Sequence, residues 1–172
     1  ENTLLLLHMD GTDASTLIRD DNGIRQTIPV IPVGNVQIDT AQSKFSGSSV
    51  LFDGTGDYLD VYPDGKLAFG TDDFTIEYFF RYSGGLPDKN RMTWEQRPGS
   101  NGAYPLIYHT TTGAVVYFVS SSARITSSTL SPNVWYHLAI VRSGSTTTMY
   151  IDGTSEGTWS DSTNYLEGSP RI

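Results

Sequence analysis

Three aromatic residues beside polar loops are the first feature of this sequence that could do chemistry. Trp94, Tyr104 and Tyr108 lie next to polar stretches that contain Glu95, Gln96 and Asn101. A sugar-binding site places an aromatic ring against the C–H face of a sugar, while amides and carboxylates bind the hydroxyls. The three aromatics are therefore candidate glycan-binding residues. The alternative is that these rings pack in the core like other strand aromatics, because periodicity alone does not separate the two faces of a strand.

Aspartates at the ends of predicted strands are the second feature. The stretch Asp53-Gly-Thr-Gly-Asp57 could place two carboxylates on one turn, and Ca²⁺ prefers carboxylate and carbonyl oxygens in loops. The spacing differs from that of an EF-hand loop. In the alternative interpretation, which we favour, each aspartate closes hydrogen bonds with the backbone of its own turn. We therefore predict no cofactor, with a structural calcium at Asp53 and Asp57 as the alternative.

No arrangement of residues predicts catalysis. Sandwich glycosidases flank the scissile bond with two carboxylates at short strand spacing, and Glu77 is the sole acid in the strand predicted around it. The histidines His8, His109 and His137 accompany no nucleophile elbow and no metal-ligand spacing. His137 alternates with apolar residues, which predicts a buried histidine with its hydrogen bonds satisfied. We predict that the protein is not an enzyme.

The overall composition excludes several classes of partner. The chain has 172 residues with 19 acidic and 11 basic side chains, a net charge of −8, and no cysteine. Nucleic acid and anionic membranes attract basic surfaces, so neither is an expected partner. No apolar run approaches the roughly 18 residues of a membrane-spanning helix. The absence of cysteine excludes thiolate metal sites and thiol catalysis.

The strongest periodic element runs from Asp73 to Tyr82. Aromatic or branched residues fall at every second position, which is typical of a strand with one buried face. The residues of that row are Phe74, Ile76, Tyr78, Phe80 and Tyr82. On the opposite row Thr75, Glu77 and Arg81 are polar and Phe79 is the exception. We expect the first row to face a second sheet, with Phe52, Leu138 and Ile140 contributing to the same core.

Many short strands with turn signals between them complete the pattern. The expected strands cover residues 3–9, 25–30, 35–38, 49–53, 57–62, 74–82, 91–96, 103–109, 114–120, 123–126, 134–142 and 146–151. Residues 49–53 and 57–62 are expected to form a hairpin across Gly54-Thr55-Gly56. Such a series predicts an all-β fold, an antiparallel β-sandwich or jelly roll. We find no linker and predict a single domain over residues 1–172.

Six short motifs carry a resemblance to a known family. They are LLLHMDG at 5–11, TAQSKF at 40–45, LFDGTGDYL at 51–59, FTIE at 74–77, WYHLAIVR at 135–142 and YIDG at 150–153. In this order and spacing the chain resembles the laminin-G-like, concanavalin A-like jelly-roll domains found in bacteriophage structural and tail proteins and in large bacterial surface proteins. The resemblance implies a concanavalin A-like antiparallel sandwich. It says much less about a ligand, because the scaffold defines the family.

The resemblance also predicts an incomplete end. Family members usually continue into a final strand with a Gly-x-Ile-Asp-Glu-like motif, and no such motif follows Arg171 and Ile172. We therefore predict that the chain lacks its last strand and is part of a longer chain. An open edge is expected to be covered by another chain or by a continuation of this one. The alternative is that residues 163–172 fold back over it.

The resemblance, the acidic Ser/Thr/Gly/Tyr-rich composition and the missing catalytic motifs lead to one functional prediction. We expect a non-enzymatic structural or appendage domain on the virion surface of a bacteriophage, a decoration, fibre or tail module that touches host surface glycans. Its partners would be other virion proteins and further copies of itself. The alternative is a lectin-like adhesion domain of an extracellular bacterial surface protein. A sandwich glycosidase that depends on Glu77 is the third class.

Overall fold

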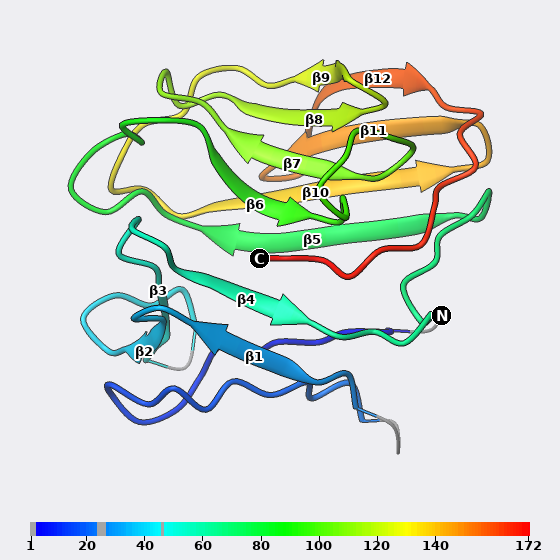
Figure 1. Cartoon of the computed structure of the whole chain (residues 1–172). Coiled ribbons are helices and arrows are strands. Elements are labelled where there is room, and N and C mark those ends of the chain that lie inside the picture. The colour runs from blue at the N-terminus through cyan, green and yellow to red at the C-terminus, as the bar shows by residue number, and fades with distance from the viewer. Residues whose placement is uncertain (1–2, 24–26, 46) are drawn as a thin grey trace. The chain divides into compact units, whose positions relative to one another are not determined.

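The computed structural model describes residues 3–23, 27–45 and 47–172 of the chain (Figure 1). This part contains twelve β-strands and no helix, and all the strand pairs are antiparallel. The all-β prediction is therefore confirmed. The described residues contain no helix with the length and apolarity needed to cross a membrane. They divide into two compact units, the first extending to Leu67 and including Ser169–Ile172, the second being Ala68–Gly168. The single-domain assignment stays a prediction.

The first unit contains two small sheets. Strand β1 (Val30–Val33) pairs with β4 (Tyr58–Val61), and β2 (Gln37–Asp39) pairs with β3 (Ser49–Leu51). The predicted hairpin between residues 49–53 and 57–62 is therefore wrong, because these segments belong to different sheets. The short turn between the two segments predicts that they pair with each other. In the structure each of them pairs with an earlier strand instead, β3 with β2 and β4 with β1.

The carboxylate of Asp57 supplies the physical reason. Its Oδ2 accepts a hydrogen bond from the backbone N–H of Asp53 at 2.7 Å, and its Oδ1 accepts one from the N–H of Asn35 at 2.6 Å. The turn is thus tied to the segment between β1 and β2. Gly34 is required beside it, because a Cβ there would lie 2.3 Å from Asp57 Oδ1 and the backbone has φ +82°.

The first unit has its own apolar core. It is built from Ile18, Val36, Ile38 and Leu59, with Phe52 and other half-buried residues packed against them. The prediction that Phe52 shares a core with the strand beginning near Phe74 is wrong, because Phe52 packs in the core of the first unit. Phe52 lies directly before the Asp53–Asp57 turn and therefore stays with the first unit.

The apolar N-terminal segment alternates without forming a strand. Leu5 and Leu7 are half-buried and Leu4 and Leu6 are exposed, so the predicted period of two is present. The predicted strand over residues 3–9 is wrong: the Leu6 N–H donates to the Asp20 carboxylate at 3.0 Å, so of the two backbone groups of Leu6 only the carbonyl meets backbone, accepting from the Asp21 N–H at 2.8 Å. Of the strand predicted over 25–30, residues 25 and 26 lie outside the described residues, and Val30 begins β1.

The C-terminal residues lie along β4. The Ile172 carbonyl accepts from the Leu59 N–H at 2.7 Å, the Ile172 N–H donates to the Leu59 carbonyl at 3.1 Å, and the Pro170 carbonyl accepts from the Val61 N–H at 3.0 Å. Arg171 also pairs with Asp60 at 2.8 Å. This edge of β4 is therefore covered by the chain's own tail. The missing last strand and the covering of its open edge by another chain or by a continuation stay predictions.

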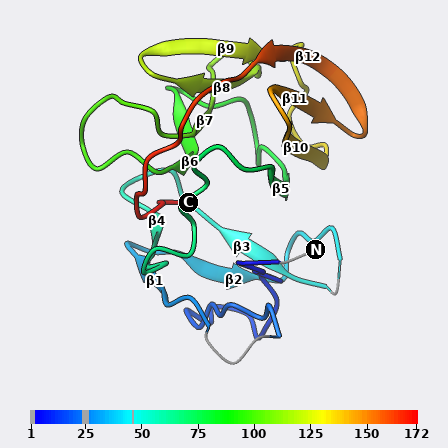
Figure 2. The ribbon, with the colours of Figure 1, turned by 90° about the vertical axis from the view of Figure 1, so that its right-hand side faces the viewer.

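The second unit is a sandwich of two four-stranded sheets (Figure 2). One sheet has the order β12-β11-β10-β5 and the other β6-β7-β8-β9. The strands are β5 (Phe74–Phe80), β6 (Arg91–Glu95), β7 (Leu106–His109), β8 (Val115–Val119), β9 (Ser122–Thr126), β10 (Tyr136–Ser143), β11 (Thr146–Ile151) and β12 (Thr154–Ser160). The predicted hairpin of residues 103–109 and 114–120 is confirmed as β7–β8.

The inner rows of β5 and β10 form the core between these sheets. Buried there are Phe74, Ile76, Leu138 and Ile140. Tyr78 and Phe80 are half-buried in the same row, and the Phe80 ring meets that of His109 on β7 at 4.5 Å. The predicted facing of this strand is therefore confirmed. Phe79 points to the other side and is 39% exposed.

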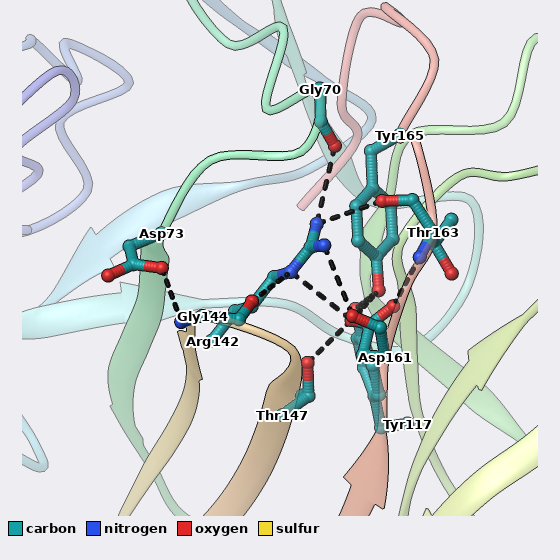
Figure 3. A network of polar contacts seen from close by, with 9 residues as sticks. All are labelled: Gly70, Asp73, Tyr117, Arg142, Gly144, Thr147, Asp161, Thr163 and Tyr165. Carbon is teal, nitrogen blue, oxygen red and sulfur yellow. Dashed lines mark hydrogen bonds and ion pairs between the residues drawn. The ribbon is translucent and has the colours of Figure 1, made fainter.

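A buried polar network joins the two sheets at one end (Figure 3). The guanidinium of Arg142, on β10, donates to four backbone carbonyls, those of Thr163 at 2.9 Å, Asp161 at 3.2 Å, Gly70 at 3.3 Å and Gly144 at 3.3 Å. Arg142 is 3% exposed. A buried charge needs partners at nearly every donor, and this arrangement provides them.

Asp161 is the counter-charge in this network. It is 0% exposed, and its Oδ2 lies 3.8 Å from Nε of Arg142. The same Oδ2 accepts from the Thr147 hydroxyl at 2.6 Å and the Tyr165 hydroxyl at 2.7 Å, while Oδ1 accepts from the Thr163 N–H at 3.0 Å. The carboxylate therefore holds residues 161–165 against β11.

Tyr117 extends the network to the opposite sheet. Its hydroxyl lies 2.7 Å from that of Tyr165, which itself donates to Asp161. Tyr117 is on β8, whereas Arg142 and Thr147 are on β10 and β11. One connected set of hydrogen bonds thus fixes the two sheets to each other through the segment that follows β12.

Hydrogen bonding controls the ionisation of Asp161. Burial alone would raise the pKa of its carboxyl, but the bonds from Thr147, Tyr165 and Thr163 outweigh burial and lower the pKa below the ordinary value. A lowered folded-state pKa stabilises the fold at pH above the unfolded value. That stabilisation is lost as the pH falls through the folded pKa.

We predict that Asp161→Asn lowers the free energy of unfolding by about 3–5 kcal/mol, because it leaves the buried Arg142 charge uncompensated. Urea unfolding followed by tryptophan fluorescence measures this. Asp73→Asn is the matched control, since Asp73 is exposed and accepts a single bond from the Gly144 N–H. The control should cost less than about 1 kcal/mol. Equal losses in the two variants would contradict a central role for Asp161.

Candidate functional site

Trp94 lies in the interior of the second unit. It is 7% exposed and pairs across the sheet with Ile107, which is 0% exposed. Its ring therefore offers no open face to a sugar, and it follows the alternative interpretation of a core aromatic. The ladder is irregular between Met92 and Trp94. This irregularity explains why strict alternation from the sequence does not place the residues of β6.

Tyr108 lies on the outer face of the β6–β9 sheet. Its neighbour His109 meets rings of β5 between the sheets, so Tyr108 points away from them. Phe118 of β8 points the same way, and the two rings are edge to face with centroids 6.3 Å apart. Met92, opposite Tyr108 in the ladder, is 46% exposed. Two half-buried aromatic rings, each partly accessible, thus lie beside an exposed thioether.

A polar cluster borders these rings. Glu95 pairs with Leu106, and Leu106 pairs with Phe118, so Glu95 shares the outer face. The Arg97 guanidinium donates from Nε to Glu95 Oε1 at 2.9 Å, and Nη1 donates to Asn101 Oδ1 at 2.8 Å. We call the set Met92, Glu95, Arg97, Asn101, Tyr108 and Phe118 the Tyr108 face. It joins apolar rings to a fixed array of carboxylate, guanidinium and amide groups.

The other sequence candidates of this region lie off the Tyr108 face or at its margin. Tyr104 is half-buried in the loop before β7, where its ring approaches Gly102. Gln96 is 0% exposed, and its Nε2 donates to the Gly168 carbonyl at 3.2 Å. Gln96 therefore anchors the C-terminal part of the second unit. Glycan binding by Tyr104 and Tyr108 stays a prediction.

His109 anchors β7 from the inner side. It is 1% exposed, with Nδ1 2.7 Å from the Tyr82 hydroxyl and Nε2 3.3 Å from the Tyr78 hydroxyl. Burial lowers the pKa of His109 from 6.5 to about 3, so the ring is neutral at physiological pH. Burial also raises the pKa values of both tyrosines. No sequence signal separated His109 from the other histidines.

His137 was predicted to be the buried histidine, and this is wrong. It lies on the outer face of the other sheet, where its ring stacks on Phe79 at 4.6 Å and Nε2 lies 3.2 Å from Glu77 Oε2. His137 faces outward because the β10 register opposes it to Phe79 of β5, whose side chain also points outward. The partner of Glu77 is thus an imidazole rather than the second carboxylate of a glycosidase pair.

The aspartates of the first unit are engaged in turn hydrogen bonds. Asp53 Oδ1 accepts from the Thr55 N–H at 2.6 Å, and Asp57 holds the backbone of Asp53 and Asn35. This geometry agrees with the turn interpretation. A structural calcium at these residues stays a prediction, and the chemistry of two carboxylates on one turn would allow it.

A second group of potential metal ligands lies in the same unit. The ligand atoms of His8, Asp10 and Asp21 lie within 4.8 Å of one another, and all three residues are exposed. Asp10 and Asp21 also line an open cavity of about 320 Å³ beside Ile18 and Ile38. His8 Nδ1 lies 3.7 Å from Asp21 Oδ2. These contacts also suit an ordinary solvated ion pair.

Comparison with family models decides the assignment of the chain. Residues 53–171 match the model described as the concanavalin A-like lectin/glucanases superfamily. The chain belongs to this superfamily. The family membership and the sandwich of the second unit together confirm the predicted concanavalin A-like fold. A search of curated proteins finds no match.

Solved structures with a similar fold include three proteins that differ in context. The binding domain of botulinum neurotoxin DC, solved in complex with SialylT, has a TM-score of 0.67 at 15% identity, over 99% of this chain and 42% of that one. An S-layer domain-containing protein from Clostridium thermocellum has a TM-score of 0.50 at 25% identity, over 92% and 73%. The carbohydrate-binding module CBM66 from Bacillus subtilis has a TM-score of 0.48 at 15% identity, over 83% and 90%.

These likenesses bear mainly on architecture. The chain spans less than half of the botulinum neurotoxin chain that it matches, and the identity to that chain shows the fold alone. The superfamily itself includes both lectins and glucanases. The ligand of this member must therefore be argued from its own surface.

We predict that the buried neutral His109 makes the fold sensitive to mild acid. The unfolded chain takes up a proton near pH 6.5, whereas the folded ring resists protonation until about pH 3. Stability present above pH 6.5 is therefore lost as the pH falls, by about 2 kcal/mol between pH 7 and pH 5 for this group. His109→Gln, which cannot titrate, should flatten that part of the profile in urea unfolding. Parallel profiles for both proteins would contradict the role of His109.

Proposed function

We propose that this domain is a lectin-like, non-enzymatic carbohydrate-binding module. The observation that supports this most directly is the Tyr108 face, where half-buried, partly accessible aromatic rings lie beside a hydrogen-bonded polar cluster. Tyr108 and Phe118 offer apolar surface for the C–H face of a sugar, and Glu95 and Asn101 offer acceptors for hydroxyls. Membership of a superfamily that contains lectins supports the same conclusion.

The electrostatics of this face favour an uncharged glycan. Arg97 donates from both Nε and Nη2 to the Glu95 carboxylate, so its charge is neutralised within the face. The net charge of the chain is −8, which repels polyanionic sugars at a distance. Hydroxyl-rich neutral polysaccharides are the class that this surface fits best.

We propose a non-enzymatic module because Glu77, the candidate catalytic acid, lacks the second carboxylate that a glycosidase needs. The Glu77 carboxylate is exposed, and the ionisable group that it meets is His137 at 3.2 Å. Glycoside hydrolysis uses two carboxylates about 5–10 Å apart on either side of the bond. Incubation with the polysaccharide panel named below should therefore release no reducing ends, and release that Glu77→Gln abolishes would revive the glycosidase alternative.

We predict that Tyr108→Ala weakens polysaccharide binding about tenfold, because an aromatic anchor of a binding site typically contributes more than 1.4 kcal/mol. Affinity electrophoresis through gels containing dextran, mannan, galactomannan or xylan measures the retardation. Tyr108→Phe retains the ring and should bind nearly as the parent does. Tyr62→Ala is the control, since Tyr62 is a 48% exposed aromatic of the first unit. Retardation by none of the four polysaccharides would count against the proposal.

The setting that we propose is the surface of a bacteriophage virion, as a decoration, fibre or tail module that contacts host glycans. Motifs that resemble those of phage structural proteins, such as LFDGTGDYL at 51–59, support it. The module would act beside other virion proteins and as a homo-oligomer, since particle proteins are usually symmetric assemblies. The alternative is an adhesion domain on a bacterial cell surface, and the likeness to an S-layer domain-containing protein favours that alternative.

Mass spectrometry of purified particles separates the two settings. For a virion module we expect peptides of this chain in particles banded by density gradient, at a stoichiometry that repeats with the particle symmetry. For an adhesion domain we expect the peptides in the cell-envelope fraction instead. Detection in the envelope alone, with none in particles, would reject the virion setting while leaving carbohydrate binding untouched.

A further inference from the structure

An exposed aromatic ring lies on the opposite side of the sandwich from the Tyr108 face. Phe79 is 39% exposed on β5, in an outward row where the neighbouring residues Thr75 and Glu77 are polar. The inner row of the same strand is occupied by Phe74 and Ile76, so the core does not need Phe79. A large ring at this position has a packing role only toward the outer surface.

Cross-strand contacts hold this ring in place. His137 of β10 is directly opposite Phe79 in the ladder, and the two rings stack with centroids 4.6 Å apart and planes inclined by 28°. His137 Nε2 also lies 3.2 Å from Glu77 Oε2. The backbone N–H of His137 donates to Asp152 Oδ1 at 2.8 Å. The carboxylate and the two rings are therefore fixed relative to one another by regular strands.

The surroundings of this set are rich in hydroxyl groups. The next row of residues across the strands on this outer face contains Glu77, Ala139 and Tyr150. Ala139 lies opposite Glu77 on one side and opposite the half-buried Tyr150 of β11 on the other. The row beyond it contains Thr75, Val141, Thr148 and Thr158. The core of a protein–protein interface is apolar and aromatic, whereas this surface has isolated rings among carboxylate and hydroxyl groups. We call Glu77, Phe79, His137 and Tyr150 the Phe79 face.

From this arrangement we infer that the Phe79 face is a second carbohydrate-binding surface, so that one domain binds two polysaccharide segments on its two outer faces. The inference rests on the proposed function. Phe79 and Tyr150 supply the apolar surface and Glu77 accepts sugar hydroxyls. The exposed Glu77 carboxylate disfavours acidic sugars by charge repulsion, so the ligand class is again a neutral polysaccharide.

Two binding faces on one rigid sandwich have a consequence that a single face lacks. Both faces belong to the second unit, and their strands are joined through one core. Each domain then links two chains of a long polysaccharide. Such linking forms a network and precipitates the polymer, while the same domain with one intact face binds without precipitation.

The test uses the full chain with dextran, mannan, galactomannan and xylan as probes. Phe79→Ala and Tyr108→Ala each remove one ring, the double variant removes both, and Tyr62→Ala is the control. Melting temperatures confirm that each variant is folded. We expect each single variant to retain part of the retardation in affinity electrophoresis, and the double variant to lose roughly ten times more affinity than either, because each ring acts at its own site.

The second measurement is turbidity with long polysaccharide. The parent and Tyr62→Ala should precipitate it, and both single variants should remain clear. Glu77→Gln, which keeps the ring, should reduce binding in the Tyr108→Ala background and leave the first face unaffected. Unchanged precipitation and retardation in Phe79→Ala, with complete loss in Tyr108→Ala, would overturn the second face and leave the proposed function standing. Failure of the parent to bind any of the four probes would overturn both.

Discussion

The ion pair of Arg142 and Asp161 is the interaction on which the second unit depends most. Both side chains are almost completely removed from water, where an unpaired charge would cost several kcal/mol. The structure meets this constraint with backbone carbonyls around the guanidinium and with hydroxyls around the carboxylate (Figure 3). The partner Tyr165 comes from the segment after β12 and also meets Tyr117 of β8 in the other sheet, so satisfying the pair also ties the two sheets together.

The fixed position of the sheets determines which side chains reach the surface. In a strand, neighbouring residues leave opposite faces, so a shift of one residue in register would turn the outer rows inward. His109 and Tyr108 are adjacent in β7, and the hydrogen bonds of His109 to Tyr78 and Tyr82 hold its ring between the sheets. Tyr108 must therefore face outward. On the other sheet the pairing of His137 with Phe79 has the same effect.

The inner polar groups and the outer rings thus have separate roles. Inside, Asp161 and His109 are held in one charge state by hydrogen bonding and burial, which stabilises the scaffold at neutral pH. Outside, the aromatic and polar groups of the two faces make no contact that the interior network requires. A superfamily that includes both lectins and glucanases is the expected result, because the chemistry lies on surfaces that the core does not constrain.

The sequence by itself determined the fold class and much of the local structure. The alternation from Phe74 to Phe80 correctly predicts a strand with a buried row, and the hairpin of β7 and β8 follows from two apolar runs around Gly113. These features depend on the period of two and on turn chemistry, which are local properties. The same rules failed for Asp53–Asp57, since a two-stranded hairpin and a crossing between sheets use similar turns. Pairing partners are a long-range property that the turn does not encode.

The candidate site shows the same division residue by residue. The sequence singled out Tyr108 with Glu95 and Asn101, and the structure places these three on one outer face. It did not show that Trp94 is buried, because a ladder irregularity in β6 changes the alternation there. It also predicted a buried position for His137, whereas His109 is the histidine that the structure buries. Composition and spacing define which residues are available, while only the tertiary register decides which of them meet water, since exposure depends on the sheet packed against the opposite face.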